Sequence, residues 1–123
     1  MASSNLIIAF ADDDQDDREF FIDAIGSLDT SVQILQFKNG ADLIGHLESC
    51  GNESPDLIFL DLNMPVMNGK QCLRKLRLSL TLNKLPVIIF STSDSESDVN
   101  DTYNLGANLY LKKTYSLKAL RES

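Results

Sequence analysis

Several residue types are scarce in this sequence of 123 residues, which has no tryptophan, one histidine, two cysteines and three prolines. Cys50 and Cys72 form no CxxC motif and have no paired histidine, so the pattern indicates neither a zinc site nor a disulfide framework. We expect both to be free thiols in a reducing cytosol. His46 lies in a segment of helical pattern without metal-ligating neighbours, and we expect it to be exposed.

Basic residues are outnumbered, because 11 lysines and arginines face 18 aspartates and glutamates, and the formal net charge is −7. A binder of nucleic acid or of an anionic membrane needs a basic face, so neither partner is expected. Long hydrophobic runs are also missing. The run from Leu6 to Ala11 is too short for a membrane span or a signal-peptide core, and no basic residue precedes it. We therefore expect a cytoplasmic protein.

Apolar runs of strand length alternate with segments of helical periodicity. Strands are expected at 6–11, 32–37, 57–61, 87–90 and 109–111. Helices are expected at 20–28, 43–47, 70–80, 96–105 and from 116 onward, the third with Leu73, Leu76 and Leu80 on one face. This alternation predicts a parallel sheet covered by helices on both faces, in a single α/β domain over residues 1–123. With 43% hydrophobic residues the chain can bury a core without disulfides or a structural metal.

Polar residues follow the predicted strands at their carboxyl ends, where open parallel sheets bind ligands. The first strand ends in Asp12 and Asp13, the third in Asp61, the fourth in Ser91 and the fifth in Lys113. If the first and third strands are neighbours, the three carboxylates share one pocket.

Clustered carboxylates repel one another and raise each other's pKa unless a cation lies between them. Oxygen ligands without histidine or cysteine suit Mg²⁺ or Mn²⁺ rather than zinc. A hard divalent metal, a lysine and a hydroxyl together suit a phosphoryl group, and a carboxylate can form an aspartyl phosphate. The residues by themselves therefore indicate phosphoryl transfer at a metal-bound carboxylate site.

Four motifs occur in order, at residues 11–14 (ADDD), 60–69 (LDLNMPVMNG), 86–91 (PVIIFS) and 106–113 (GANLYLKK). With these motifs the sequence resembles the receiver domain of two-component response regulators over essentially the whole chain. The resemblance implies a flavodoxin-like, doubly wound (βα)₅ domain whose five-stranded parallel sheet has the order 2-1-3-4-5.

The resemblance also implies roles for the acids. Asp61 matches the phosphoacceptor. Asp12 and Asp13 match the acidic pair that binds Mg²⁺, with Asp13 the more direct ligand. The backbone carbonyl of Asn63 matches the third protein ligand of the metal, and Mn²⁺ would fit the same ligands.

Three further positions match the family's switching residues. Ser91 matches the hydroxyl that reaches toward the phosphoryl oxygens, and Lys113 matches the lysine that pairs with the acceptor carboxylate and later with the phosphate. Lys112 should point the other way, because side chains alternate along a strand. Tyr110 matches the aromatic residue that swings inward when the switch hydroxyl moves.

The family's function implies protein partners. A sensor histidine kinase or a histidine phosphotransfer protein would donate the phosphoryl group, and a changed protein-binding face would act on a downstream protein. Such a domain catalyses only its own phosphorylation and dephosphorylation, so an enzyme for other substrates is not expected. No output domain follows in the sequence, which leaves a stand-alone receiver and a piece of a longer protein both open.

Two positions depart from the family pattern. Thr114 follows the lysine where the family usually has proline, often after a cis bond, and a cis bond before a non-proline residue is costly. Thr92 is bulkier than the small residue usual after the switch hydroxyl, which could slow the access of water or of the phosphodonor.

The acids after the first strand allow other interpretations. Asp12, Asp14 and Asp16 echo the start of an EF-hand loop, but Asp17 and Asp23 stand where that loop has glycine and glutamate. Acids before a helix are also good N-caps and complement its dipole, which is the expected role of Asp14, Asp16 and Asp17.

Three rival functions share the fold or the chemistry. Aspartyl-phosphate phosphohydrolases have a D-x-D motif after the first strand, and Asp12 and Asp14 fit that spacing, but Gln15 follows and no cap domain fits. A receiver used only as a docking module would need no acceptor, yet the metal acids, acceptor and lysine are all present. A flavin phosphate needs a Gly/Ser/Thr-rich loop, and the loop here is acidic.

Overall fold

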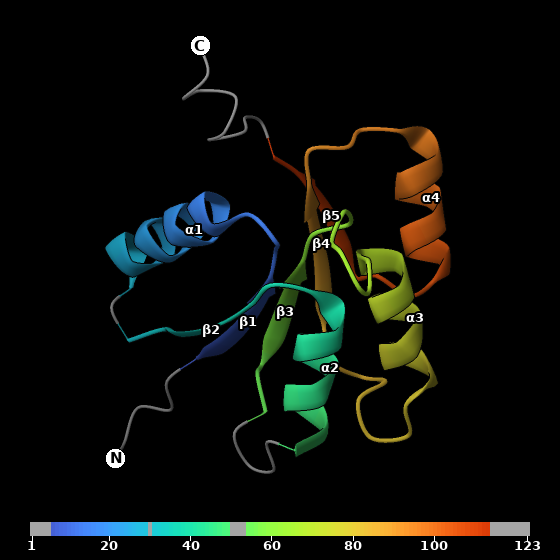
Figure 1. Cartoon of the computed structure of the whole chain (residues 1–123), viewed down its shortest axis with the longest axis horizontal. Helices are drawn as coiled ribbons and strands as arrows, with labels where there is room; N and C mark the ends of the chain where they lie inside the picture. Colours follow the sequence, from blue (N-terminus) through green and yellow to red (C-terminus); the bar gives the residue numbers. More distant parts are fainter. Residues whose placement is uncertain (1–5, 30, 50–53, 114–123) are drawn as a thin grey trace.

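The computed structural model describes residues 6–29, 31–49 and 54–113, which form one parallel sheet with four helices (Figure 1). The strands are β1 (Ile7–Ala11), β2 (Gln33–Phe37), β3 (Leu57–Leu60), β4 (Val87–Ser91) and β5 (Leu109–Lys112). The helices are α1 (Gln15–Leu28), α2 (Gly40–Ser49), α3 (Gly69–Leu78) and α4 (Glu96–Asn104). All neighbouring strands are parallel in the order β2-β1-β3-β4-β5, which confirms the predicted fold. None of the described helices has the length and apolar character to cross a bilayer.

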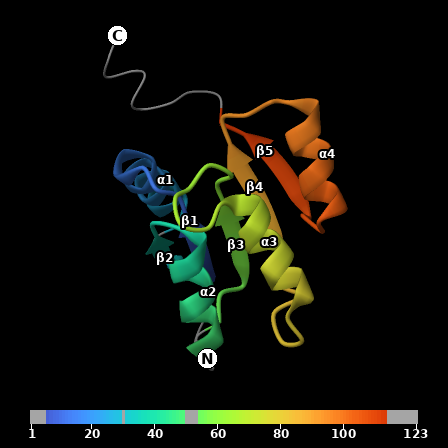
Figure 2. The ribbon, with the colours of Figure 1, turned by 45° about the vertical axis from the view of Figure 1, so that its right-hand side comes forward.

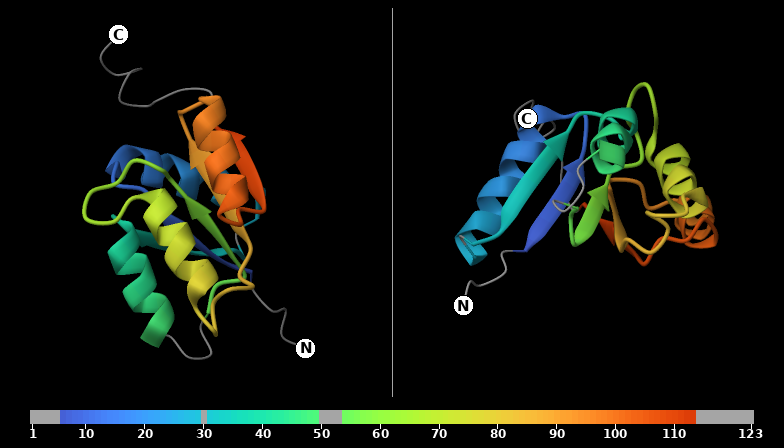
Figure 3. Two further views of the ribbon diagram at one scale, coloured as in Figure 1. Left: turned by 90° about the vertical axis from the view of Figure 1, so that its right-hand side faces the viewer. Right: turned by 90° about the horizontal axis from the view of Figure 1, so that it is seen from below.

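Helices cover both faces of the sheet. α1 lies on one face, and α2, α3 and α4 lie on the other (Figures 2 and 3). The predicted helix from residue 116 onward falls outside the described residues, as do Thr114 and Cys50. Cys72 is a buried free thiol, as expected, and burial raises its pKa to about 12.

The two faces follow from the alternation of side chains along the strands. In β1, Ile8 and Phe10 pack on the α1 side, where the rings of Phe10 and Phe21 stack with centroids 4.2 Å apart. Ala9 and Ala11 belong to the core on the α2 and α3 side. Both faces of β1 are covered, which explains why its sequence is a continuous apolar run.

Side-chain caps fix the starts of the helices that border the sheet's carboxyl edge. The Asp14 carboxylate accepts hydrogen bonds from the N–H groups of Asp16 and Asp17, which confirms its predicted capping role. Asn68 and Gln71 form a reciprocal capping box at the start of α3. These bonds satisfy helix N–H groups that would otherwise lack partners.

Two expectations about exposure are wrong. α3 ends at Leu78, so Leu80 is not on the buried face of the helix and is 96% exposed. His46 is half-buried rather than exposed, because α2 packs it against β2, with its ring centroid 5.3 Å from that of Phe37. Its Nε2 is buried and has no hydrogen-bond partner among the described residues.

Gly69 begins α3 directly against the end of β3. Its N–H donates to the Leu62 carbonyl oxygen over 2.9 Å, and a Cβ at this position would overlap the carbonyl oxygen of Asp61. Only glycine fits this close approach of two backbone segments. The contact sets the position of Asp61 relative to α3.

We predict that Gly69→Ala lowers the free energy of unfolding by about 2 kcal/mol or more, because the added methyl group must displace the Asp61 backbone. Gly45→Ala is the matched control, since Gly45 lies inside α2 and, apart from the local helix backbone, no atom lies within 4 Å of the added Cβ. That change should raise stability by roughly 0.5–1 kcal/mol, because alanine is the better helix former. Urea denaturation followed by circular dichroism measures both, and equal effects would contradict the prediction.

Candidate functional site

The pairing of β1 with β3 brings two acidic side chains together. Ala11 pairs with Leu60 at the end of the ladder, and the next residues are Asp12 and Asp61. The Asp61 N–H donates to the Ala11 carbonyl oxygen, and the Asp12 N–H donates to the Phe37 carbonyl oxygen of β2, each over 3.0 Å. Both aspartates are therefore fixed at the carboxyl edge of the sheet, where the sequence predicted the site.

Asp13 completes an acidic triad with Asp12 and Asp61. One carboxylate oxygen from each residue lies within 4.8 Å of the others. Asp12 and Asp61 are buried whereas Asp13 is exposed, so the triad is accessible to solvent from one side. A set of carboxylate oxygens at this spacing suits a hard divalent cation.

Lys113 is the buried cation that faces the triad. It follows β5, and its backbone N–H donates to the Ser91 carbonyl oxygen of β4 over 2.7 Å. Its Nζ lies 2.6 Å from the Asp12 carboxylate, 3.1 Å from that of Asp17 and 3.9 Å from that of Asp61. The ammonium therefore forms hydrogen bonds with Asp12 and Asp17, and it forms a longer ion pair with Asp61, the partner that the resemblance implied.

Lys112, one residue earlier, is directed away from the triad. Its side chain is 51% exposed, and its Nζ lies 3.0 Å from the carboxylate of Asp94. The predicted alternation of the two lysines is confirmed.

Asp61 is the most perturbed carboxylate of the triad. Burial raises the pKa of Asp61, and the negative charge of Asp12 raises it further. The charge of Lys113 and the N–H of Leu62, which donates to the Asp61 carboxylate over 2.9 Å, lower the pKa. The balance leaves the pKa of Asp61 at about 7. A further cation beside the triad would favour the ionised form.

Asp12 and Lys113 form a buried ion pair. Burial raises the pKa of Asp12 and outweighs the opposite influence of Lys113. Burial lowers the pKa of Lys113, but the charges of Asp61 and Asp12 outweigh it, so the pKa is raised overall. Lys113 is therefore a charged ammonium at neutral pH, available to an anion at the triad.

Two residues of α1 join the site, although the sequence indicated another role for Asp17 and none for Arg18. Asp17 was expected to act only as a cap or dipole charge, yet it forms an ion pair with Lys113 over 3.1 Å. Arg18 is buried, and its guanidinium donates to the Asp12 carbonyl oxygen over 2.7 Å. Both residues lie in the first turn of the helix after the acidic loop. Charged residues at such positions are equally typical of a solvent-exposed helix face, so the sequence does not predict these contacts.

The two predicted switch residues meet the segment that follows β4. Ser91 is fully buried, and its hydroxyl oxygen accepts the Ser93 N–H over 3.2 Å. The Ser93 hydroxyl donates to Asp98 of α4 over 2.6 Å, and the Tyr110 hydroxyl donates to the Ser93 carbonyl oxygen over 2.8 Å. Ser93 thus connects β4, α4 and β5 by hydrogen bonds.

A small polar cavity lies beside the site. Asn63, two residues after Asp61, is exposed and lines this cavity of about 170 Å³ together with Lys70 and Asp98. Lys70 of α3 bonds Asp98 over 2.7 Å and Asp101 over 3.0 Å, both on α4. These ion pairs connect α3 to α4 near the acids.

Sequence comparison decides the family. The model of the response regulator receiver domain matches residues 8–123. The chain belongs to this family. It is therefore a receiver domain of two-component signalling, with an acidic pocket at the carboxyl edge of its sheet, and not an enzyme acting on other substrates.

Relatives and solved structures agree with this assignment. The response regulator Rcp1 of Synechocystis sp. is 28% identical to this receiver domain over 118 residues, which cover 93% of this chain and 80% of Rcp1. Protein PilH of Pseudomonas aeruginosa is 36% identical over 81 residues, 66% of this chain and 64% of PilH. The phosphorylated cyanobacterial phytochrome response regulator RcpA matches with a TM-score of 0.85 at 28% identity, covering 97% of this chain and 88% of RcpA. The Mn²⁺-bound form of Rcp1 matches with a TM-score of 0.82 at 27% identity, covering 95% of this chain and 87% of Rcp1.

We predict that Asp61→Asn stabilises the receiver domain at high pH but not at low pH. The pKa of Asp61 is about 7 in the folded protein, against an ordinary value of 3.8. Between these two pH values the folded state keeps a proton that the unfolded state has lost, so the free energy of unfolding falls as the pH rises. Asparagine does not ionise, so the variant avoids the cost of a buried charge at this position. Its free energy of unfolding should be higher by about 2 kcal/mol near pH 8, which is roughly half of the value that the whole pKa difference implies, because solvent partly screens the site.

Urea denaturation in EDTA, at about pH 4 and about pH 8, measures this effect. Asp23→Asn on the exposed part of α1 is the control and should change stability little at either pH. An equal gain for Asp61→Asn at both pH values would contradict the prediction.

Proposed function

We propose that this receiver domain accepts a phosphoryl group on Asp61 from a sensor histidine kinase or a histidine phosphotransfer protein. The observation that carries the proposal is the position of Asp61, buried at the sheet edge with Asp12 and Asp13 within 4.8 Å and the Lys113 ammonium 3.9 Å away. A carboxylate nucleophile between a divalent-cation site and an ammonium is well placed to react with a phosphoryl anion.

The donor set fits Mg²⁺ or Mn²⁺. Three carboxylates face one ammonium, and the uncompensated negative charge contributes to the raised pKa of Asp61. Asp12, Asp13 and Asp61 would hold the ion together with the backbone carbonyl of Asn63. When bound, the ion neutralises charge on the carboxylates and the phosphoryl oxygens. The Mn²⁺-bound structure of the relative Rcp1 supports this proposal.

In the transfer, a carboxylate oxygen of Asp61 attacks the phosphorus of the phosphohistidine donor. An O–P bond forms while the P–N bond breaks, and the electron pair leaves on the imidazole nitrogen. Lys113, which Asp12 and Asp17 position, donates to a phosphoryl oxygen. Attack by water later releases inorganic phosphate and restores Asp61, so the domain catalyses only its own phosphorylation and dephosphorylation.

Ser91 and Tyr110 couple the phosphoryl group to the protein surface. The Ser91 hydroxyl turns toward the phosphoryl oxygens and gives up its bond with the Ser93 N–H. Because Ser93 also bonds Asp98 and Tyr110, its displacement moves α4 and lets Tyr110 swing inward. The changed surface then binds a downstream protein.

Two observations support the wider assignment. The chain belongs to a family of two-component signalling, and its relative RcpA is a phytochrome response regulator solved in its phosphorylated form, which supports a sensor kinase as the upstream partner. A phosphohydrolase built on Asp12 and Asp14 is disfavoured, because the Asp14 carboxylate is already engaged as the cap of α1.

We predict that acetyl phosphate adds one phosphoryl group to the chain in the presence of Mg²⁺ but not in EDTA. Asp61→Asn should abolish the adduct, because the nucleophilic oxygen is lost. Intact-mass spectrometry measures both, with Asp56→Asn, an exposed aspartate before β3, as the control that keeps the adduct. A stoichiometric adduct on Asp61→Asn would refute the assignment of the acceptor.

We predict that Asp13→Asn weakens Mg²⁺ binding at least tenfold, because a triad carboxylate is lost. Asp14→Asn is the matched control, since asparagine also caps helices and Asp14 lies outside the triad. Isothermal titration calorimetry with MgCl₂ measures both affinities. An equal loss in the two variants would show that general acidity, rather than the triad, binds the ion.

A further inference from the structure

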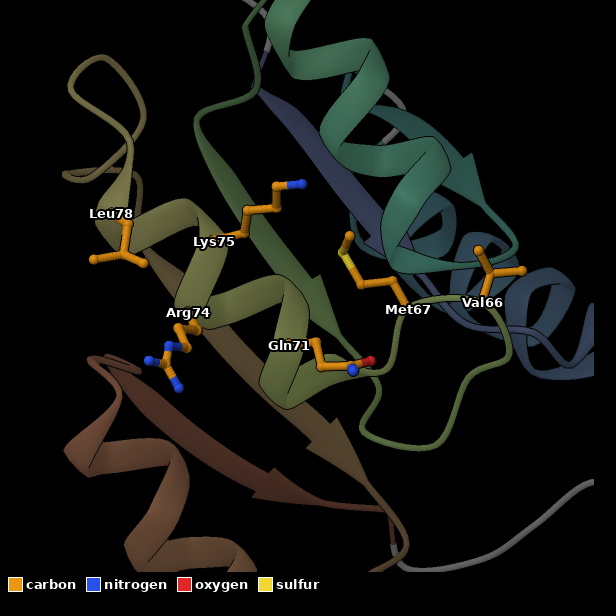
Figure 4. A pocket seen from close by; sticks show the side chains of 6 residues that line it. All are labelled: Val66, Met67, Gln71, Arg74, Lys75 and Leu78. Carbon is orange, nitrogen blue, oxygen red and sulfur yellow. The ribbon is translucent and has the colours of Figure 1, made fainter.

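A groove of about 290 Å³ lies on α3, away from the acidic triad (Figure 4). Its lining comes from the loop between β3 and α3 and from α3 itself: Val66, Met67, Gln71, Arg74, Lys75 and Leu78. In Figure 4, Lys75 extends from α3 toward α2, and Met67 lies beside the start of α2. The groove therefore runs along the outer side of α3, next to α2.

The four groove residues on α3 form one helical stripe, with spacings of three, four and seven from Gln71. Leu78 at its end is 73% exposed, and Val66 at the other end of the groove is 82% exposed. The buried face of the helix carries Leu73 and Leu76 instead. The stripe thus combines exposed apolar side chains with the stems of two cations, and such a face can pack against a partner helix.

The charge of α3 contrasts with that of the chain. Its sequence, GKQCLRKLRL, holds four basic residues and no acid, in a chain of net charge −7. Lys70 is held by acids of α4, and Arg77 donates to backbone oxygens that include the Gly106 carbonyl. Arg74 and Lys75 make no ion pair or side-chain hydrogen bond with the described residues. Their charges are available to an acidic partner at the groove.

Val66 adds strain to this surface. It is the one non-glycine residue of the described chain with a positive φ, at 67°, a region that β-branched residues rarely adopt. Its side chain gains no core burial in return, since it is almost fully exposed. A strained, exposed valine at the rim of a groove is understandable when the side chain contacts a partner.

We propose that this groove, the α3 groove, binds an amphipathic helix of a protein partner that carries acidic and apolar side chains on one face. Apolar side chains of the partner contact Val66, Met67 and Leu78, and its carboxylates pair with Arg74 and Lys75. A second copy of this chain is a poorer occupant, because the basic α3 of one copy would contact an acidic surface of another. Such a head-to-tail contact forms rings or filaments rather than the commoner two-fold dimer. Arg74 and Lys75 by themselves are also too few positive charges to bind a nucleic acid.

The test uses a fluorescein-labelled helical peptide with leucine and glutamate at i, i+3, i+4 and i+7 of one face. Fluorescence anisotropy at low salt gives its affinity, and amide shifts in ¹⁵N NMR spectra give its location. We expect binding at α3 and at residues 66 and 67. The double variant Arg74→Glu/Lys75→Glu should weaken binding about tenfold or more, whereas Lys84→Glu, an exposed lysine outside the groove, should not.

Val66→Gly separates binding from folding. Glycine adopts this φ without strain, so the urea midpoint should be unchanged or higher, while the affinity for the peptide falls about fivefold with the loss of one apolar side chain. A loss of both stability and affinity would contradict the role given to Val66.

Three outcomes would overturn the proposal. The first is no binding at millimolar peptide, the second is equal binding of a peptide with lysine in place of glutamate, and the third is full affinity in the double variant. Sedimentation velocity completes the test by measuring self-association. If the chain self-associates and the double variant does not, a second copy of the chain occupies the groove. The peptide-binding measurement is repeated with Asp61→Asn, which lacks the proposed phosphoacceptor. The result is therefore independent of the proposed phosphorylation.

Discussion

The ion pair between Lys113 and Asp12 is the interaction on which the acidic site depends. Their charged atoms lie 2.6 Å apart, and their side chains are only 6% and 1% exposed. The pair joins the residue after β5 to the residue after β1, two strands that β3 and β4 separate in the sheet. Removal of Lys113 would leave the buried Asp12 carboxylate without its ion-pair partner, so the pair constrains both ends of the site.

One ammonium does not balance three carboxylates. Lys113 bonds Asp12 and Asp17 and is more distant from Asp61, whose pKa is raised to about 7 as burial and Asp12 oppose its ionisation. The acids cannot separate to relieve this repulsion, because backbone hydrogen bonds fix their strand ends. The site is therefore suited to a divalent cation, and the cation in turn makes it suited to a phosphoryl anion.

α3 relates this site to two different surfaces. At its start, Gly69 packs on the Asp61 backbone, and Lys70 bonds Asp98 and Asp101 of α4. The Ser93 hydroxyl also bonds Asp98. On its outer side, the α3 groove combines exposed apolar side chains with the cations Arg74 and Lys75. A rearrangement of the segment after β4 would change the contacts at the start of α3. The α3 groove, in contrast, faces solvent and is accessible to another protein.

The sequence by itself determined the elements and the edge at which the chemistry lies. Buried strands and amphipathic helices are recognised from local periodicity, and Asp12, Asp13 and Asp61 stand directly at strand ends, so their meeting follows from the parallel order alone. Only the tertiary structure decided the partners of Lys113, the contacts of Asp17 and Arg18, and the burial of His46. Lys113 and Asp12 are 101 residues apart, and which acid the ammonium reaches depends on how β5 and α1 are placed around β1 and β4. That placement results from packing over the whole sheet, which no local pattern of residues encodes.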